Sequence, residues 1–388
     1  MNKTTLPFVC VLALIAACGT TKSGSGTPTP TPGPTGTPLP GGTTGARWVM
    51  PYINLIADNV TPANVNYASL SHLALSFLIP NSDGTVGNSL SQASSFAQHA
   101  HAAGKKFILS VGGAFDSDGF PGAVSSANRS KFVTNLITIV NSTGADGIDI
   151  DWEQPPSSEP DRSNMISLVN DLKAAKSGLI VTSALGYHNI NGGAFSGATA
   201  TFYSQLGAVL DQMNLMTYDM MGPWGGWVTW HNSPLQGEES DHPTSAMSTV
   251  AAYVAAGVPA GKLGIGIPFY GDCVGSPVTG PPQDWGGASI LGYDLAMSYD
   301  MIMKSYYNAA NYVYDTIAEV PYLSFSSPTG SRGCTYITYE DRRSIAAKGA
   351  YAQSSGIGGV IIWQLTEDYT PAGETDSLLQ TVWKSFNP

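Results

Sequence analysis

The chain has 388 residues, of which 43% are hydrophobic and only 12% are charged, and its formal net charge is −11 at pH 7. This acidic balance disfavours a polyanionic partner, so nucleic acid is excluded as the expected ligand, whereas a neutral ligand is compatible with it. After the N-terminal leader, no apolar run approaches the length that spans a bilayer.

The first residues predict export from the cell. Residues 1–17 contain an apolar run from Leu6 to Ala17, which is too short to cross a bilayer but has the length of a secretory signal. The run leads into Cys18-Gly19 in a pattern that resembles a bacterial lipobox. We therefore expect Cys18 to be lipidated and to be the only membrane attachment. The alternative is an ordinary signal peptide that is cut near Ala17.

A spacer separates this leader from the folded part of the chain. Residues 18–46 are mainly Pro, Thr and Gly and have no hydrophobic period, so they predict an extended linker. About 340 residues remain, which is a normal length for an elaborated α/β barrel.

Short β-rich runs alternate with helical patterns through the rest of the chain. The eight runs are Arg47 to Ile53, Leu70 to Leu78, Lys105 to Val111, Gly147 to Trp152, Leu179 to Gly186, Gln212 to Tyr218, Lys262 to Phe269 and Gly358 to Leu365. Helical patterns include Asn88 to Ala103, Asn128 to Ser142, Pro160 to Lys176, Ala246 to Gly257 and Tyr339 to Ser354. Eight such runs predict a parallel (β/α)₈ TIM barrel, with a doubly wound open sheet as the alternative.

The long interval between the seventh and eighth runs predicts an inserted subdomain. Residues 272–340 mix Gly, Pro, Tyr and short β-like pieces, so we expect an α+β insertion between strand 7 and helix 7 of a barrel formed by residues 47–271 and 341–388. Loops at the carboxyl ends of barrel strands surround the active site, so the insertion should form one wall of the cleft. Cys273 and Cys334 lie within it, either as a disulfide or as two separate thiols.

The most informative run is the octapeptide D-G-I-D-I-D-W-E from Asp146 to Glu153. Side chains two apart on a strand share a face, so Asp149, Asp151 and Glu153 line one face and the bulky apolar residues line the other. Like charges this close repel when partly desolvated, and at least one acid should hold a proton at neutral pH. A protonated carboxyl in a cleft suits a general acid.

A calcium loop is the main alternative for this acidic pattern. Such a loop needs a turn glycine and polar residues between its ligands, but here the intervening residues are Ile, Ile and Trp. We therefore expect no metal and no cofactor. Asp146 has the opposite parity to the other three acids, so we expect it to have a structural role at the start of the strand.

These motifs together resemble family 18 of the glycoside hydrolases, the chitinase family. The octapeptide is similar to the family signature D-x-x-D-x-D-x-E, and the resemblance extends from about Trp48 to Trp383. The other matching segments are Ser110-Val111-Gly112-Gly113, Met216-Thr217-Tyr218-Asp219, Gly266 to Gly271, Tyr314-Asp315 with Pro321 to Leu323, and Val360 to Trp363.

The resemblance implies a substrate-assisted, retaining mechanism in which the substrate's acetamide group is the nucleophile. It assigns proton donation to Glu153 and stabilisation of the oxazolinium intermediate to Asp151. Asp149 would share a proton with Asp151 and be held by Tyr52 and Ser110 when Asp151 turns toward Glu153. Tyr218 would donate its hydroxyl to the acetamide oxygen.

The resemblance also implies substrate contacts. It assigns these to Asp219, Trp224, Met216 and Phe77, with Trp363 as the floor beneath the sugar. For Trp227 and Trp230, loop packing is an equal alternative, and weaker candidates are Trp285, Tyr293, Tyr306 and Tyr307. The sequence departs from the family at Gln154, where many members carry an aromatic residue, and at Gly271-Asp272, where Gly-Arg is common.

The sequence therefore predicts an exported chitinase that acts on chitin or N-acetylglucosamine oligosaccharides as a monomer. One alternative is an endo-β-N-acetylglucosaminidase that cuts N-glycans by the same mechanism. Another is a catalytically silent glycan-binding lipoprotein, although such lectins typically lose the acid, and Glu153 is present.

Overall fold

The computed structural model describes residues 45–54, 60–114, 116–153, 156 and 159–388. The leader, most of the linker and Gln154 lie outside these residues. Eight parallel strands form the centre of the molecule: β1 (Trp48–Asn54), β2 (His72–Pro80), β4 (Lys106–Gly112), β5 (Gly147–Asp151), β6 (Ile180–Gly186), β7 (Gln212–Met216), β8 (Leu263–Pro268) and β14 (Gly359–Trp363). Strand β1 pairs with both β14 and β2, so the sheet closes on itself. The predicted barrel is confirmed, and the open sheet was the wrong alternative.

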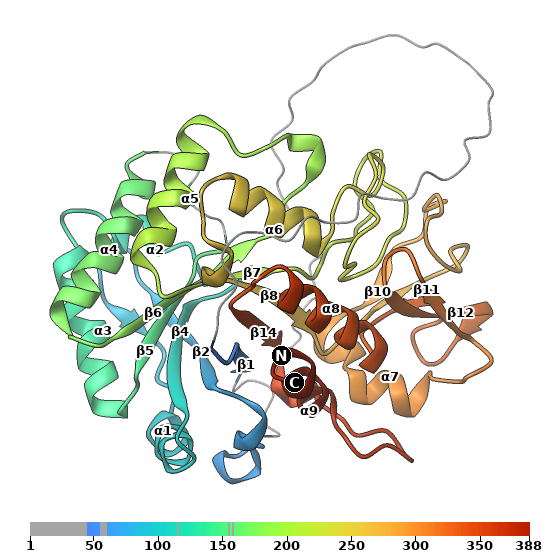
Figure 1. The fold of residues 1–388 in the computed structure, drawn as a ribbon, viewed down its shortest axis with the longest axis horizontal. Helices are drawn as coiled ribbons and strands as arrows, with labels where there is room; N and C mark the ends of the chain where they lie inside the picture. The colour runs from blue at the N-terminus through green and yellow to red at the C-terminus, as the bar shows by residue number, and fades with distance from the viewer. Residues whose placement is uncertain (1–44, 55–59, 115, 154–155, 157–158) are drawn as a thin grey trace, which may run out of the picture. The chain divides into compact units, whose positions relative to one another are not determined.

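Helices surround the barrel on its outer side (Figure 1). They are α1 (Ala93–Ala102), α2 (Phe120–Ala123), α3 (Arg129–Thr143), α4 (Asp161–Ala175), α5 (Gly197–Val209), α6 (Ala246–Ala255), α8 (Arg342–Ser354) and α9 (Leu378–Phe386). In α3 the buried residues Phe132, Leu136 and Val140 recur every four positions, which places them on the face toward the strands. Gly144 ends this helix with a left-handed backbone, which glycine adopts without a steric penalty.

Two apolar layers follow from the alternation along the strands. Outward-facing residues such as Ile148 and Ile150 of β5 join the large core beneath the helices. Inward-facing residues such as Met50, Ile108 and Ile361 fill the barrel interior together with Tyr52 and other aromatic side chains. Polar residues at inward positions near the strand ends are therefore held between a packed interior and the open face of the barrel.

The segment between β8 and β14 forms a second sheet, shown at the right of Figure 1. Its antiparallel strands are β9 (Asp272–Val274), β10 (Ile290–Gly292), β11 (Tyr312–Asp315), β12 (Val320–Thr329) and β13 (Cys334–Thr338), accompanied by α7 (Tyr299–Ser305). A disulfide joins Cys273 of β9 to Cys334 of β13, with an S–S distance of 2.04 Å, which decides between the two expected states of these cysteines.

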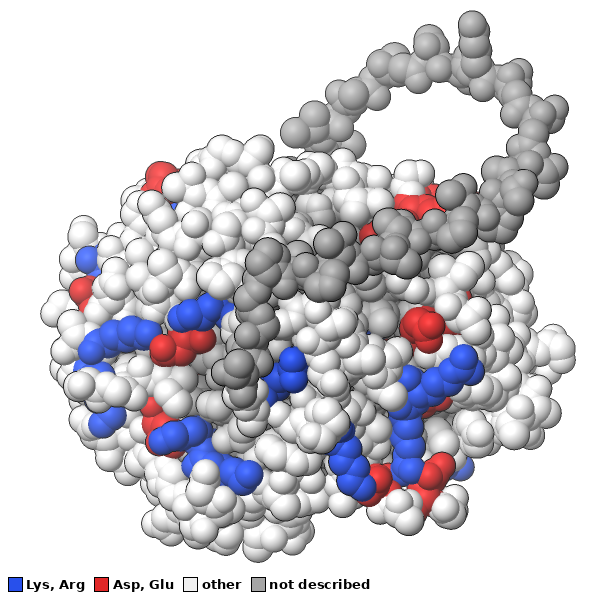
Figure 2. Space-filling model, viewed as in Figure 1, with Lys and Arg blue, Asp and Glu red and all other residues white. Residues whose placement is uncertain are grey.

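Charged side chains are sparse on the surface. On the face seen in Figure 2, basic and acidic residues are interspersed and most atoms belong to neither class. None of the helices in the described part of the chain combines the length and apolar character needed to cross a bilayer.

Candidate active site

The acidic side chains of β5 point into the carboxyl-terminal end of the barrel. Asp149 is fully buried, Asp151 is 4% exposed, and Glu153, just after the strand, is half-buried. Trp152 faces the other way and stacks on Phe120, with ring centroids 5.0 Å apart, in the core beneath the helices. The strand period thus separates three acids facing the cleft from the apolar residues that anchor the strand.

Asp149 is held by three hydroxyl groups. Tyr52 of β1 donates to Oδ2 at 2.9 Å, Ser110 of β4 donates to the same oxygen at 2.8 Å, and Thr182 of β6 donates to Oδ1 at 2.6 Å. Burial raises the pKa of Asp149, and the three hydrogen bonds offset part of that rise. Thr182 was not among the predicted site residues, although it sits directly beside Asp149 in the strand register and at an inward-facing position.

Asp151 lies nearer the carboxyl end of β5 than Asp149 and has fewer hydrogen-bond partners in the described part of the chain. Its Oδ1 atom is buried and has no hydrogen-bond partner among the residues that the structure describes. Burial, followed by the charges of Glu153 and Asp149, holds the pKa of Asp151 well above its usual range. Burial and the neighbouring negative charges therefore act in the same direction, and both favour the protonated form of Asp151.

The main chain of Asp151 is fixed by the neighbouring strand end. Its carbonyl oxygen accepts hydrogen bonds from the Gly113 N–H at 2.9 Å and from Ser117 Oγ at 3.0 Å. Gly112 has a φ of +109°, and a Cβ atom at this position would lie 2.2 Å from the same carbonyl oxygen. Only glycine permits this close approach, so β4 and the carboxyl end of β5 are packed main chain to main chain.

The pKa of Glu153 is raised in the cleft. Loss of hydration in the cleft, followed by the charge of Asp219, raises its pKa to about 7. A carboxyl with this pKa is protonated in a large fraction of molecules near neutral pH and can deliver that proton within the cleft.

Tyr218 and Asp219 follow the end of β7. Tyr218 is 8% exposed in the barrel interior, where burial beside several acids raises the pKa of its phenol well above the usual range, so the hydroxyl remains a donor. Asp219 is exposed to the cleft and has a φ of +55°. Its N–H donates to Asn232 Oδ1 at 2.6 Å, and Tyr270 donates to its Oδ1 at 2.6 Å.

Loss of hydration in the cleft raises the pKa of Asp219 to about 6, although the hydrogen bond from Tyr270 lowers it. Asn232 and Tyr270 were missed in the sequence because they lie on other segments and nothing in the local pattern connects them to Asp219. Met216, the last residue of β7, is half-buried against the interior group.

Two aromatic rings form a floor at the same end of the barrel. Trp363 ends β14 and stacks on Phe77 of β2 with centroids 5.7 Å apart and an interplanar angle of 19°. Both rings are half-buried. The Trp363 Nε1–H donates to Asp294 Oδ1 of the insertion at 2.9 Å, a contact that the sequence did not predict.

The other aromatic candidates divide by burial. Trp224 and Trp227 pack edge to face at 4.6 Å and stay half-buried on their loop, and Tyr293 and Tyr307 are 46% and 40% exposed. Trp230, Trp285 and Tyr306 are 3%, 7% and 5% exposed and belong to apolar cores. For Trp230 this is the packing role that was the equal alternative, and the burial of Trp285 and Tyr306 disfavours them as substrate contacts. Trp230 also donates its Nε1–H to the Thr244 carbonyl oxygen at 3.1 Å.

Asp146 has the structural role that its parity predicts. Its carboxylate accepts from Lys106 Nζ at 2.9 Å and from the Phe107 N–H at 2.9 Å, and contacts His101 Nε2 at 2.8 Å. Burial acts to raise its pKa, but these hydrogen bonds outweigh it and leave the pKa lowered. Asp146 therefore joins β5 to β4 and stays outside the cleft.

Further acids lie on the insertion side. Asp272 belongs to the Gly271-Asp272 pair at which the sequence departs from the resemblance. It is 3% exposed, and burial followed by the charge of Asp219 raises its pKa well above the usual range. Within the described ranges, no group of three or more His, Cys, Asp or Glu side chains is arranged to hold a metal ion.

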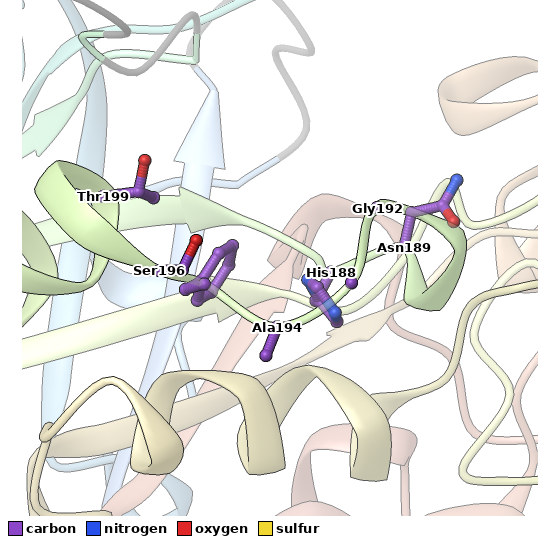
Figure 3. A pocket seen from close by; sticks show the side chains of 8 residues that line it. His188, Asn189, Gly192, Ala194, Ser196 and Thr199 are labelled. Atoms are coloured by element: carbon purple, nitrogen blue, oxygen red, sulfur yellow. The ribbon is translucent and has the colours of Figure 1, made fainter. Parts of the chain in front are cut away.

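The loop between β6 and α5 borders a separate pocket of about 260 Å³. Figure 3 shows Asn189 at one end of this loop and Ser196 and Thr199 at the start of α5. The pocket is also lined by His188 and Phe195, whose rings pack edge to face at 4.8 Å. None of the acids of β5 lines it.

Comparisons with known proteins agree with this geometry. A family model described as "Glycosyl hydrolases family 18" matches residues 50–368. The chain is 28% identical over 342 residues to endochitinase 1 of Metarhizium robertsii, covering 80% of this chain and 78% of that protein. It is 31% identical over 292 residues to chitinase A1 of Niallia circulans, covering 68% of this chain but only 40% of that protein.

Solved structures share the fold. A chitinase from Rhizomucor miehei has a TM-score of 0.72 at 24% identity and covers 88% of this chain and 99% of its own. A chitinase-like agglutinin from Robinia pseudoacacia has a TM-score of 0.69, also at 24% identity, covering 87% of this chain and 99% of its own. Because the fold is shared with a protein described as an agglutinin, the arrangement of the site's own residues has to decide between catalysis and binding.

Proposed function

Because the chain belongs to glycoside hydrolase family 18, we propose that its acidic strand and aromatic floor hydrolyse β-1,4 linkages between N-acetylglucosamine units of chitin or its oligosaccharides. One observation carries the proposal. Loss of hydration raises the pKa of Glu153 to about 7 in the cleft, and the neighbouring Asp151 has a buried Oδ1 that lacks a partner within the described residues. Glu153 can donate a proton, and the Asp151 Oδ1 can accept a hydrogen bond from the substrate.

The chemistry begins with proton transfer from Glu153 to the glycosidic oxygen. As the bond to the anomeric carbon breaks, the carbonyl oxygen of the substrate's own acetamide bonds to that carbon, forming an oxazolinium ion. The Asp151 Oδ1 accepts the acetamide N–H, and the Tyr218 hydroxyl donates to the acetamide oxygen. Water then attacks the anomeric carbon, gives a proton to Glu153 and leaves a product with retained configuration.

The aromatic floor supports binding of the reacting sugar. The apolar face of a pyranose stacks on an indole, and Trp363 presents a half-buried ring that stacks on Phe77. Trp224 and Trp227 offer a second aromatic surface on the loop after β7. A neutral polymer suits this cleft, because its walls carry several carboxyl groups that would repel an anionic chain.

Product analysis separates this proposal from its rivals. The protein is incubated with N-acetylglucosamine oligomers and, separately, with a high-mannose glycopeptide, and products are identified by mass spectrometry. We expect cleavage of the oligomers to short products, mainly dimers, and no cleavage of the glycopeptide. Cleavage of the glycopeptide alone would identify an endo-β-N-acetylglucosaminidase. Binding of oligomers without cleavage of either substrate would identify a glycan-binding protein.

We also propose that the protein is exported and attached to a membrane through a lipid on Cys18. Replacing Cys18 with Ala is expected to move the protein from the membrane fraction to the soluble fraction, because one lipid-bearing residue is the whole anchor. Cell fractionation followed by immunoblotting measures the shift. Cys10→Ala is the matched control in the same leader and should leave the distribution unchanged. A Cys18 variant that still sediments with membranes would contradict the proposed anchor.

A further inference from the structure

A buried carboxyl beside the aromatic floor has no role in the chemistry described so far. Glu367 ends a short 3₁₀ turn at Leu365–Glu367, directly after β14, and is 1% exposed. Neither of its carboxyl oxygens has a hydrogen-bond partner of suitable geometry within the described residues. A carboxylate in such a place is strongly disfavoured, so the group is expected to bind a proton.

The neighbour of Glu367 is another acid, Asp294 of the insertion. The two carboxyls lie within hydrogen-bonding reach of each other, and the more distant Asp219 adds a third negative charge. Loss of hydration, followed by the charge of Asp294 and the hydrogen bond to it, raises the pKa of Glu367 to about 10, although the Gln364 main chain lowers it. Two carboxyls can form a hydrogen bond only when one is protonated, so Glu367 is the donor and Asp294 the acceptor.

Asp294 also accepts the indole N–H of Trp363 at 2.9 Å. It begins the 3₁₀ turn Asp294–Met297, which is fixed to the end of β8 by hydrogen bonds from Gly271 N–H to the Met297 carbonyl and from Tyr299 N–H to the Phe269 carbonyl. The main chain that carries Asp294 is therefore hydrogen-bonded to the barrel. A proton on Glu367 would therefore complete a chain of two hydrogen bonds, from Glu367 to Asp294 and from the Trp363 indole to Asp294.

We infer that Glu367 is a positioning residue: its carboxylic acid donates to Asp294, and Asp294 holds the Trp363 indole in the orientation that supports the sugar at the reacting centre. The inference rests on the proposed function. An apolar residue at position 367 would leave Asp294 free to turn toward water, and the indole would lose its fixed partner. Small displacements of a positioning group have large effects on turnover, because the reacting atoms must be aligned.

A double-mutant cycle tests whether Glu367 acts through Trp363. Glu367→Met removes the donor and is expected to lower kcat for N-acetylglucosamine oligomers by about 10- to 100-fold. Glu367→Gln keeps an N–H donor of similar shape and should retain kcat within about threefold of the wild type. In a Trp363→Phe background there is no indole N–H to hold, so Glu367→Met should cause little further loss.

Equal losses from Glu367→Met in both backgrounds would overturn the inference, because the residue would then have only a general structural effect. Asp294→Ala removes the acceptor, and Asp294 is only half-buried, so this variant tests the inference if Glu367→Met does not fold. It should lower kcat as much as Glu367→Met does, and it should likewise cause little further loss in the Trp363→Phe background. Thermal unfolding of each variant identifies such a case.

A second measurement does not depend on activity. With ¹⁵N-labelled tryptophan, the Trp363 indole N–H signal is assigned by its absence in Trp363→Phe, and its hydrogen exchange is recorded. Exchange should be slow in the wild type and in Glu367→Gln and faster in Glu367→Met. Unchanged exchange in Glu367→Met would overturn the positioning role. A wild-type protein with the expected exchange pattern but no hydrolysis would overturn the proposed function alone.

Discussion

Replacing Glu153 with Gln is expected to lower kcat for N-acetylglucosamine oligomers by about 10²- to 10⁴-fold, with little effect on oligosaccharide affinity. The amide has the shape of the acid but no proton to give to the glycosidic oxygen. Steady-state kinetics gives the loss of turnover, and isothermal titration calorimetry with an oligomer gives the affinity. Turnover equal to that of the wild type would remove Glu153 from the proposed mechanism.

The pH profile provides an independent readout of the same group. Because the acid must be protonated to act and its pKa is raised to about 7, activity of the wild type should fall as the pH rises above about 7. The residual activity of Glu153→Gln should lack this alkaline decline. Asp146→Asn is the matched control from the same octapeptide. It should lower stability through its lost contacts to Lys106 and Phe107 and leave the alkaline decline in place.

The second large effect is expected at Asp151. Asp151→Asn should lower kcat by about 10²- to 10³-fold, because a neutral amide stabilises the developing oxazolinium charge poorly and presents its own N–H groups to the acetamide. Release of a fluorogenic leaving group from a short N-acetylglucosamine oligomer, followed in single turnovers, measures the step directly. The slow step should be leaving-group release itself rather than a later one.

A control for Asp151→Asn is a substitution beside Asp149, the neighbouring acid on β5. Thr182→Val removes one of the three hydroxyl donors to Asp149 while keeping the shape of the side chain. Its effect on leaving-group release should be much smaller than that of Asp151→Asn, because Tyr52 and Ser110 still hold Asp149. If both variants slow release equally, the charge on Asp151 has no special role and the strand network acts only as a scaffold.

Local periodicity explains which parts of the site were predictable. The alternation within D-G-I-D-I-D-W-E separated the three cleft acids from Asp146 and from the apolar face, whereas short β-rich runs between helical patterns predicted the strands of the barrel. A strand pattern contains this information because side-chain direction depends only on the parity of the position. Thr182 could have been found in the same way, since it faces inward on the next predicted strand.

The remaining partners could not be read from local patterns. Asn232, Tyr270, Asp294 and Glu367 reach the site from loops and from the insertion, and only the folded chain brings them together. The aromatic residues posed the opposite difficulty. Composition cannot distinguish an exposed indole from a buried one, so packing and sugar contact stayed equal alternatives for Trp230, and Trp285 stayed a weaker candidate. The structure packs both into a core.

The close approach of Gly112 to the Asp151 carbonyl oxygen has a consequence for protein engineering. The two strand motifs S-x-G-G and D-x-x-D-x-D-x-E cannot be varied independently, because any side chain at position 112 would push the catalytic strand outward. Libraries or chimaeras that exchange one strand should therefore exchange β4 and β5 together as a cassette. Diversity is better directed to positions such as Trp224 and Tyr293 in the loops after β7 and β8, whose side chains stand partly exposed.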